Sequence, residues 1–409
     1  METIAVQCCI AGGGPAGMML ALLLARAGVE VLVLEKHADF LRDFRGDTIH
    51  PSTLQVMAEL GVLDDFLKLP HQKAYSINAQ IGASTFAFAD FSHLPTRCGF
   101  VAIMPQWDFL NFIAGQGKRY PSFALRMRAE VTGLIEESGG IVGVRAATVE
   151  GDVAIRANLV VGADGRHSIV RKAGGLEILD LGAPMDVLWF GIPRRPGDPV
   201  ETTGRFDAGR IFIMINRGDS WQCGFVIPKD TIARIHARGL PAFRDEIVNL
   251  APFVGDRVGM LDDWASVKLL TVRVDRLRRW YRAGLLCIGD AAHAMSPIGG
   301  VGINLAIQDA VAAANVLALP LRQGRPVGDL LRRVQERRAL PTRITQWLQV
   351  AVQDRVITPL FAQQAAISPP LLLRLIARFP ALRRIPGRLV GMGFRPEHVR
   401  SPEAGSLGA

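Results

Sequence analysis

The stretch AVQCCIAGGGPAGMMLALLLARAGVEVLVLE, residues 5–35, contains the pattern that decides the fold. It combines a short apolar run at 4–10, an apolar helical pattern at 18–27 and a second apolar run at 29–34. A glycine-rich turn separates the first run from the helix, and Gly28 separates the helix from the second run. This order predicts two buried parallel strands joined by a helix, the βαβ unit of a Rossmann-like α/β domain.

The turn itself has the spacing G-x-G-x-x-G at Gly12, Gly14 and Gly17. The first glycine of this spacing permits a tight turn, the second lets the backbone approach a pyrophosphate, and the third lets the helix pack against the strand. The helix start supplies free N–H groups and the positive end of a dipole to the phosphates. Glu35, 23 residues after Gly12, is placed to accept hydrogen bonds from ribose hydroxyls. The motif predicts dinucleotide binding rather than a turn without a ligand, but it does not distinguish FAD from NAD(P).

Composition narrows the class of protein. A chain of 409 residues with 49% apolar and 21% charged residues is expected to form two or three domains. Its five cysteines lack the spacing of a zinc site, so we expect no disulfide framework and no metal. The net charge of +9 suits nucleic acid, an anionic membrane surface or anionic small ligands. No nucleic-acid-binding motif accompanies it, and a solvated basic face is therefore favoured.

The N-terminal sequence has no basic segment followed by a cleavage-type site, which favours the cytoplasm. We also recognise no run of about 18 uncharged apolar residues, and a membrane-spanning helix is not expected.

Two more glycine-rich motifs follow short apolar runs. The run at 157–161 precedes GADGRHSIVR at 162–171, and the run at 284–288 precedes GDAAHAMSPIGGVGINLAIQDA at 289–310. Each motif places an aspartate where a strand is expected to end. Two such carboxylates, far apart in sequence, suit a long bipartite ligand whose sugar or ribityl hydroxyls they brace without acting as catalytic acids.

In this order, GGGPAG with Glu35, GADGRHSIVR and GDAAHAMSPIGGVGIN resemble the motifs of the single-component FAD-dependent aromatic hydroxylases, the p-hydroxybenzoate-hydroxylase-like flavoprotein monooxygenases. The resemblance implies FAD as cofactor and NADPH or NADH as cosubstrate. It implies an α/β fold with a Rossmann-like FAD-binding domain (GR2-type), an inserted mixed β-sheet substrate domain and C-terminal helices. The implied reaction uses O2 and a C4a-hydroperoxyflavin to hydroxylate a small aromatic substrate.

The resemblance also implies roles for individual residues. The ADP half of FAD would contact the first motif and its acid, namely Gly12, Gly14, Pro15, Ala16, Gly17, Glu35 and Lys36. The middle of FAD and its ribityl chain would contact Arg45, Gln106, Asp164, Gly165, Gly289 and Asp290. The isoalloxazine ring would lie against Pro297, Gly299, Gly300, Val301, Gly302, Ile303 and Asn304. Pro297 and Gly299 would be nearest to the reacting oxygen, as steric elements rather than acids.

Other positions of the resemblance leave alternatives open. His167 and Arg171 match positions that contact the nicotinamide cosubstrate. The alternative for Arg171 and for Arg45 is a surface ion pair, and for His167 it is an exposed histidine at a helix start. His293 is a candidate base by position, although the corresponding residue of the family more often packs behind the flavin loop. One departure is Val301, which replaces the polar residue of a G-Q-G or G-K-G turn.

The chain between the second and third motifs is dominated by strand-like runs. Strand-like runs occur at 189–193, 210–216, 221–228 and 265–274, a helical run occurs at 231–250, and 76–91 is expected to add strands to the same sheet. Candidate substrate contacts on these strands are Trp189, Met214, Asn216, Gln222 and Phe225, with packing in the core as the alternative. The expected domains are an FAD-binding domain at 1–75, 100–182 and 270–320, a substrate-binding sheet at 76–99 and 183–269, and a C-terminal helical region at 321–409.

Several alternatives remain at this level. The basic C-terminal helices are expected to pack on the flavin domain or to form a homodimer contact, with contact to a membrane surface as a less favoured role. A flavin-dependent halogenase shares the fold, but WQCGFVIP only echoes the W-x-W-x-I-P motif. A geranylgeranyl-type reductase and a flavin-binding scaffold without catalysis are the other rivals.

Overall fold

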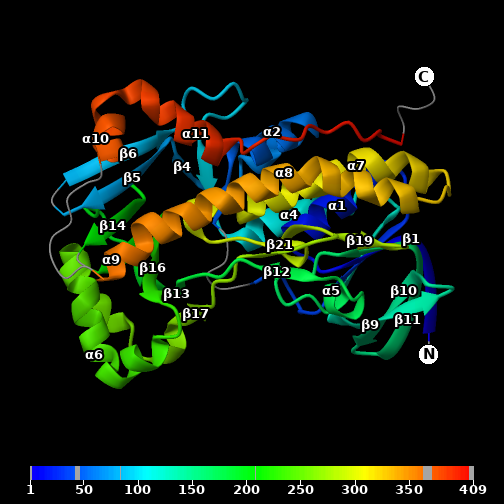
Figure 1. Ribbon diagram of the computed structural model, residues 1–409, viewed down its shortest axis with the longest axis horizontal. Coiled ribbons are helices and arrows are strands. Elements are labelled where there is room, and N and C mark those ends of the chain that lie inside the picture. The colour runs from blue at the N-terminus through cyan, green and yellow to red at the C-terminus, as the bar shows by residue number, and fades with distance from the viewer. Residues whose placement is uncertain (1, 42–46, 83, 208, 363–370, 405–409) are drawn as a thin grey trace.

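The computed structural model describes residues 2–41, 47–82, 84–207, 209–362 and 371–404 of the chain. The protein is α/β, as the sequence predicts, and is built on two large sheets that Figure 1 shows toward opposite ends of an elongated molecule. Two smaller three-stranded sheets join them, β3–β7–β4 and β12–β18–β21, with bounds β3 Thr48–Ile49, β4 Gln72–Ala74, β7 Val101–Ile103, β12 Ile178–Asp180, β18 Asp275–Leu277 and β21 His293–Ala294.

The first large sheet has eight strands, and five of them run parallel in the order β20–β11–β1–β2–β8. Their bounds are β1 Glu2–Ala11, β2 Val31–Glu35, β8 Phe123–Met127, β11 Gly151–Gly162 and β20 Leu285–Cys287. The remaining strands are antiparallel, namely β9 Ala129–Glu137, β10 Gly140–Thr148 and β19 Tyr281–Arg282. Cys8 of the central strand β1 pairs with Leu159 on one side and with Val31 on the other, which confirms the predicted βαβ unit.

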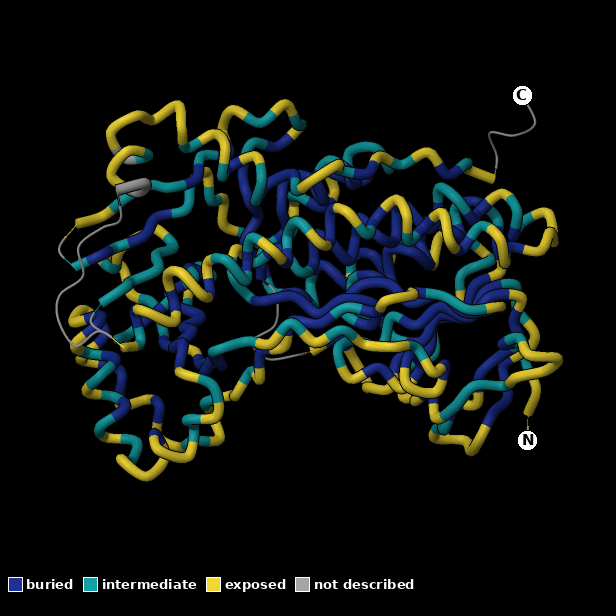
Figure 2. The backbone as a smooth tube through the Cα atoms, viewed as in Figure 1, coloured by how far each residue is buried: buried dark blue, intermediate teal, exposed yellow. Residues whose placement is uncertain are grey.

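Helices cover one side of the parallel strands. α1 (Pro15–Arg26) begins directly after the glycine turn, is apolar on all its faces and packs against α4 (Gln106–Gly117) and α7 (Gly302–Arg322). α2 (Pro51–Glu59) packs against α3 (Leu63–Phe66) and against α7. α5 (Ile169–Ala173) packs against β9. Figure 2 shows the parallel strands and this helical layer as the buried interior.

α7 differs from one expectation. Among the described residues, the segment Ile298–Arg322 is long and apolar enough to cross a membrane by length and composition, although no such run was expected. In the structure, 83% of its apolar window is buried inside the protein. It is therefore packed as a core helix between α1 and α8 (Gly328–Val352).

The second large sheet has seven strands in the order β17–β13–β16–β15–β14–β5–β6. Their bounds are β5 Ser76–Ile81, β6 Ser84–Asp90, β13 Met185–Pro193, β14 Thr203–Asp207, β15 Arg210–Asn216, β16 Ser220–Pro228 and β17 Lys268–Leu270. The expectation that 76–91 joins the strands of the later segment is confirmed. β14 was not expected, and the strand expected at 265–274 shrinks to β17. One reason is that the Val272 N–H bonds to the Asp186 carboxylate at 3.0 Å instead of to a strand.

The two faces of this sheet have different partners. On one face, which we call the outer face, Leu188, Phe190 and Phe212 pack against α6 (Ile232–Leu250), a helix kinked at Gly239. On the opposite face, the inner face, the residues are Val187, Trp189, Ile211, Ile213 and Val226, and they pack against Ile298, Ile357 and Phe361. The inner face therefore looks toward the glycine-rich loop before α7.

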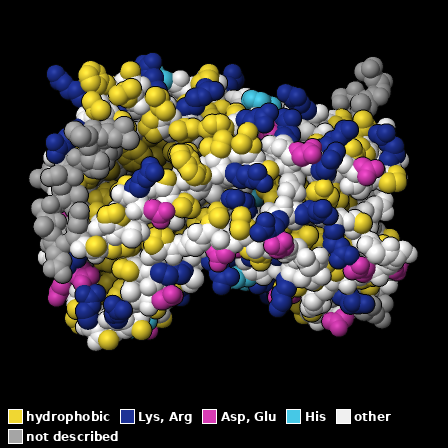
Figure 3. All heavy atoms as spheres, in the orientation of Figure 1, with side chains coloured by type: hydrophobic (Ala, Val, Ile, Leu, Met, Phe, Trp, Pro, Cys, Tyr) yellow, Lys and Arg dark blue, Asp and Glu magenta, His cyan; other side chains and the backbone are white. Residues whose placement is uncertain are grey.

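The described residues of the C-terminal part, 321–362 and 371–391, are mainly helical. α8 runs along α7 and continues through a π-helical turn at Gln353–Ile357 into α9 (Thr358–Ala362). α10 (Leu371–Arg378) and α11 (Arg384–Gly391) pack on β6 and expose Phe379 and Ile385 among arginines, as the gathered hydrophobic and basic atoms of Figure 3 show. Residues 392–404 were expected to be helical, but they form an extended strap whose last N–H, that of Ala404, bonds to the carbonyl of Arg26 at 2.9 Å.

A buried charge cluster ties these elements together. The fully buried carboxylate of Asp309, on α7, accepts from Arg338 Nε at 3.0 Å and from the Gly289 N–H at 3.1 Å, and lies 2.5 Å from His293 Nε2. Arg338 also lies 3.8 Å from the carboxylate of Glu397 on the C-terminal strap. Burial by itself would raise the pKa of Asp309, but the charges of His293 and Arg338 hold it below its usual value.

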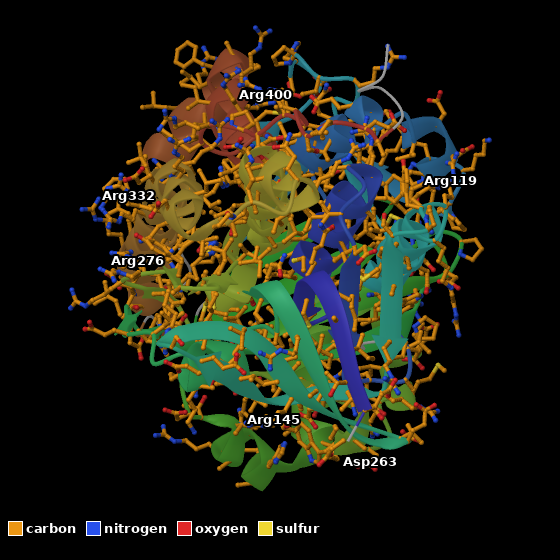
Figure 4. The ribbon with its side chains drawn as sticks, turned by 90° about the vertical axis from the view of Figure 1, so that its right-hand side faces the viewer. Arg119, Arg145, Asp263, Arg276, Arg332 and Arg400 are labelled. Carbon is orange, nitrogen blue, oxygen red and sulfur yellow. The ribbon has the colours of Figure 1, made fainter. Side chains whose placement is uncertain are left out.

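We expect Arg338→Leu to lower the free energy of unfolding by about 3–5 kcal/mol, because it leaves buried carboxylates without their arginine. Urea denaturation followed by circular dichroism measures this change. The matched control is Arg332→Leu on the same helix, since Arg332 pairs with Glu336 across side chains that are 69% and 60% exposed and stands at the molecular edge in Figure 4. An equal loss in both variants would contradict the assigned role of the cluster.

Candidate functional site

The glycine turn after β1 is packed too tightly for side chains at two positions. A Cβ on Gly17 would overlap the carbonyl oxygen of Gly12, and a Cβ on Gly12 would lie 2.8 Å from Cα of Asp164. Gly12 also has φ of +105°, a conformation that disfavours other residues. Gly14, by contrast, has open space around it, so a ligand can approach the backbone at the start of α1.

Glu35 closes this turn from the neighbouring strand. Its carboxylate is buried and accepts hydrogen bonds from the Gly13 N–H at 2.9 Å and from the His37 N–H at 3.0 Å. The acid therefore lies at the edge of the glycine turn, as the motif predicts, and it also shapes the turn. Lys36 is exposed beside it.

The second motif lies against the first. Asp164 accepts from the Val170 N–H at 3.1 Å through Oδ2, while its buried Oδ1 has no hydrogen-bond partner among the described residues. Burial raises the pKa of Asp164, and hydrogen bonds from Ser168 and Val170 oppose that rise. Gly165 has open space around it and φ of +82°. An unpaired buried acceptor beside open space is what a hydroxyl or N–H of a ligand would satisfy.

The third motif completes the same cradle. A Cβ on Gly289 would lie 3.0 Å from Cβ of Ala16, so the turn after β20 meets the start of α1. Asp290 is partly exposed and lies 3.3 Å from Arg166, which belongs to the second motif. The structure thus brings together the first, second and third motifs, which are separated by more than a hundred residues each in the chain.

The loop before α7, which we call the flavin loop, consists of residues 297–302. Gly299 and Gly300 have φ of +77° and +63°, and open space surrounds Gly302 at the first residue of α7. The first N–H groups of an α-helix have no partner within the helix, and they carry its positive dipole end. The start of α7 is therefore suited to bind a group with negative charge, and Val301 contributes only apolar surface there.

Polar side chains behind the flavin loop fix its shape, and the sequence reasoning missed them. Gly300 O lies 3.1 Å from the hydroxyl of Thr48 and 3.0 Å from His50 Nε2. Asn304 accepts through Oδ1 from the hydroxyls of Ser52 and Thr53. The available signal was the polar run TIHPST at 48–53, which begins three residues after Arg45.

His50 itself is buried. Its Nδ1 lies 2.9 Å from Val390 O on α11, so the ring sits between two carbonyl oxygens. Burial lowers the pKa of His50 to about 4, and the two carbonyl contacts oppose that shift. The ring is therefore neutral near pH 7 and joins the flavin loop to the C-terminal helices.

Two predicted FAD contacts keep the status of predictions. Arg45 lies outside the described residues. Gln106 is buried at the first residue of α4, just after β7, and β7 pairs with β3 beside the flavin loop.

The predicted nicotinamide contacts have different surroundings. His167 is exposed just before α5, as its alternative reading held. Arg171 is only 4% exposed, and its guanidinium binds both oxygens of Asp275 at 3.1 and 3.2 Å. An ion pair is therefore the role of Arg171, but a buried one. The contact of Arg171 with the cosubstrate stays a prediction.

The predicted substrate residues divide between the two faces of the sheet. Met214 and Phe225 are buried on the outer face, in the cluster that includes α6. Asn216 bonds to Val200 O at 2.6 Å and to the Gly218 N–H at 2.8 Å, so it stabilises a turn. The structure thus gives Met214 and Phe225 the surroundings of their alternative, packing in the core, because strand residues alternate between faces. Trp189 and Gln222 belong to the inner face.

His293 lies behind the flavin loop, as its alternative reading held. It is buried against Trp280, with ring centres 4.9 Å apart, and pairs with Asp309.

One ion pair joins the second large sheet to Asp47, the residue just before Thr48, which contacts the flavin loop. Arg217, in the turn between β15 and β16, binds the carboxylate of Asp47 and lies 5.4 Å from the centre of the Trp107 ring. The Asp47 side chain is fully buried. Burial raises its pKa to about 6, although Arg217 opposes that rise.

Comparisons with known proteins agree with this geometry. A family model described as an FAD binding domain matches residues 5–348. The 6-methylpretetramide 4-monooxygenase of Streptomyces rimosus is 33% identical over 401 residues, covering 96% of this chain and 94% of that protein.

Two solved structures share the fold. The OxyS anhydrotetracycline hydroxylase from Streptomyces rimosus superposes with a TM-score of 0.74 at 23% identity, over 95% of this chain and 76% of that one. The p-nitrophenol 4-monooxygenase PnpA from Pseudomonas putida DLL-E4 superposes with a TM-score of 0.73 at 20% identity, over 94% of this chain and 99% of that one.

The raised pKa of Asp47 predicts a specific pH dependence. Its folded pKa of about 6 exceeds the usual 3.8, so the folded state holds this proton more tightly than the unfolded chain. Its contribution to stability is therefore present below pH 3.8 and is lost as the pH rises through 6, by up to about 3 kcal/mol. Urea unfolding at several pH values should show this slope in the wild type and lose it in Asp47→Asn. The exposed Asp65→Asn is the control, and an unchanged slope in Asp47→Asn would contradict the assignment.

Proposed function

The chain belongs to the family of FAD-dependent aromatic hydroxylases that carry this FAD-binding domain, and we propose that its flavin lies in the cradle of the three motifs while its substrate lies on the inner face. It is a flavin-dependent monooxygenase that uses FAD, NAD(P)H and O2. The observation that carries the proposal is the contact of Ile298, from the flavin loop, with the inner-face cluster. Substrate and flavin sites are therefore neighbours.

The cradle fits FAD at several points. Open space at Gly14 and at Gly302 leaves the backbone accessible where a pyrophosphate and a ring carbonyl would bind, and Asp164 offers an unpaired oxygen between them. Glu35 would hold the ribose, and Asp290 the ribityl chain. Bound FAD would supply the redox chemistry of the reaction, namely hydride acceptance from NAD(P)H and activation of O2 for hydroxylation.

The residues of this chain bind, orient and shield. The N–H groups at the start of α7 would stabilise negative charge on the reduced ring. Pro297 and Gly299 would shape the space next to it without taking part in proton transfer. The apolar inner face, closed by Ile298 and Phe361, would keep water away from the reacting atoms.

The domain assignment follows the same division. We assign 1–75, 100–182 and 270–320 to a GR2-type FAD-binding domain and 76–99 with 183–269 to an inserted substrate domain. The seven-stranded sheet, built from both inserted segments, supports this division. Figure 3 shows the surface hollowed between α10 and α9, with hydrophobic side chains around the hollow, which suits the entry of an apolar substrate.

The substrate class follows from the inner face and the relatives. The related enzyme of Streptomyces rimosus is named for 6-methylpretetramide, and the inner face offers an apolar floor with aromatic side chains. An aromatic substrate is therefore proposed for this chain as well. A halogenase is less supported, because Cys223, which replaces the second tryptophan of the halogenase motif, is buried on the outer face.

The first test is the reaction itself. The purified protein is expected to be yellow, and a true substrate should raise NADPH or NADH oxidation and O2 consumption in step. Hydroxylated product measured by mass spectrometry completes the test. Reduction of a substrate double bond without O2 uptake would instead identify a reductase of the geranylgeranyl type.

The second test concerns the cradle. Asp290→Ala should weaken FAD binding by tenfold or more, because a charge-assisted hydrogen bond contributes about 1.5–3 kcal/mol. The ratio of flavin absorbance to protein absorbance after gel filtration measures the effect. Asp152→Ala, an exposed aspartate of β11, is the control. A fully flavinated Asp290→Ala protein would show that the third motif does not hold the ribityl chain.

A further inference from the structure

We propose that Trp189 and Gln222 recognise the substrate through one donor and one acceptor, and that they select an uncharged, flat, mostly apolar ring system bearing a hydroxyl group. This inference rests on the proposed function, because it places the substrate on the inner face. It goes further by naming the groups that orient the ring and by excluding a carboxylate as the recognition handle.

The two residues are neighbours on adjacent strands. In the β13–β16 pair, Trp189 lies opposite Gly224 and Gly191 lies opposite Gln222. Trp189 and Gln222 are therefore diagonal neighbours, and both point to the inner face because residues two apart on a strand share a face. The six-membered ring of Trp189 covers Gly224 at about 3.0 Å from where a Cβ would stand.

Both residues have a polar atom without a partner. Gln222 is only 2% exposed, and its side-chain oxygen lies buried without a hydrogen bond among the described residues. The indole N–H of Trp189 is likewise buried and unpaired among them. A buried polar group left unpaired lowers stability by about 1–3 kcal/mol. A ligand that pairs with both groups would remove this penalty for each of them.

A second tryptophan of the same sheet shows the ordinary arrangement. Trp221 is adjacent to Gln222 in sequence but points to the outer face, and its indole N–H donates to Asp198 at 3.0 Å. On the outer face, where the tryptophan only packs in the core, its indole N–H therefore has a hydrogen-bond partner. The unpaired pair occurs only on the side that faces the flavin loop, within the described part of this strand pair.

The surroundings of the pair exclude a buried charge. Trp189 packs in one cluster with Ile211, Val226 and Ile298, apolar residues that cannot pair with a carboxylate. An unpaired ion in such surroundings is strongly disfavoured. The exception is Lys268, which lies opposite Trp189 on the edge strand β17, but it is exposed there.

The floor beside the pair is flat. Gly191, directly opposite Gln222, has open space where a side chain would stand, and Gly224 is covered only by the Trp189 ring. A planar ring can therefore lie on the strand with its hydroxyl toward the Gln222 oxygen. An oxygen elsewhere on the ring would accept from the Trp189 N–H.

The test uses the FAD-loaded enzyme and three probes that share the naphthalene ring system and differ only in their substituents. Dihydroxynaphthalene carries donors and acceptors, dimethoxynaphthalene carries acceptors only, and hydroxynaphthoate carries a charge. The change of the flavin spectrum on titration gives each Kd. Wild type should bind dihydroxynaphthalene most tightly and hydroxynaphthoate most weakly.

Two variants separate the two contacts. Gln222→Met should weaken dihydroxynaphthalene binding about tenfold and leave dimethoxynaphthalene binding unchanged, because only the first probe donates. Trp189→Phe should weaken both. Gln80→Met, on the opposite face of β5, is the control and should bind all probes as the wild type does.

A stability measurement distinguishes recognition from a structural role. Since Gln222→Met removes a buried unpaired oxygen at similar volume, its Tm should be equal to or above that of the wild type. A lower Tm together with unchanged probe binding would overturn the proposal. Tighter binding of hydroxynaphthoate that Lys268→Ala abolishes would also overturn it, as would failure of the wild type to bind any probe.

Failure of this inference is distinguishable from failure of the proposed function. If the protein retains FAD and couples NAD(P)H oxidation to O2 while Gln222→Met binds all probes normally, only the recognition pair is wrong. If the protein retains no FAD, the proposed function itself is wrong.

Discussion

The structure depends on one close approach, that of the turn after β1 to the start of α1 and to the turn after β11. Gly12 and Gly17 leave no room for side chains there, so the first two motifs touch through backbone atoms. Any side chain at Gly17 would push α1 away from the strand, and α1 supports α7 in turn. The accessible backbone at Gly14, the unpaired oxygen of Asp164 and the turn at Gly289 all take their positions from this contact.

The start of α7 is held by buried polar groups rather than by the loop alone. Asp309, farther along α7, accepts from the backbone N–H of Gly289 in the third motif, while His50 and Thr48 contact the carbonyl oxygen of Gly300. Buried ion pairs and hydrogen bonds add little to the free energy of folding, but removing one partner lowers stability strongly because the other partner is left buried and unpaired. The loop therefore cannot shift without unpairing them, and the positive end of α7 keeps its position beside the loop.

The second sheet shows why a sequence pattern places strands better than side chains. Apolar strand residues predicted the sheet, but which of them face the ligand depends on the parity of each strand. Met214 and Phe225 lie on the outer face, whereas Trp189 and Gln222 lie on the inner face. All four lie in strand-like runs and are buried or half-buried, so the local sequence does not show which face each one occupies.

The sequence by itself determined the βαβ unit and the three motifs, because glycines and apolar runs act within a few residues of the chain. The cofactor and the class of enzyme followed from the resemblance of these three motifs, in their order, to those of a known family. Only the tertiary structure decided that Arg171 binds Asp275, 104 residues away, and that Asp309 joins Arg338 to the third motif. It also decided which side of the substrate sheet meets the flavin loop. These outcomes depend on strand register and helix packing, which are set by contacts between distant segments and leave no local signal in the residues themselves.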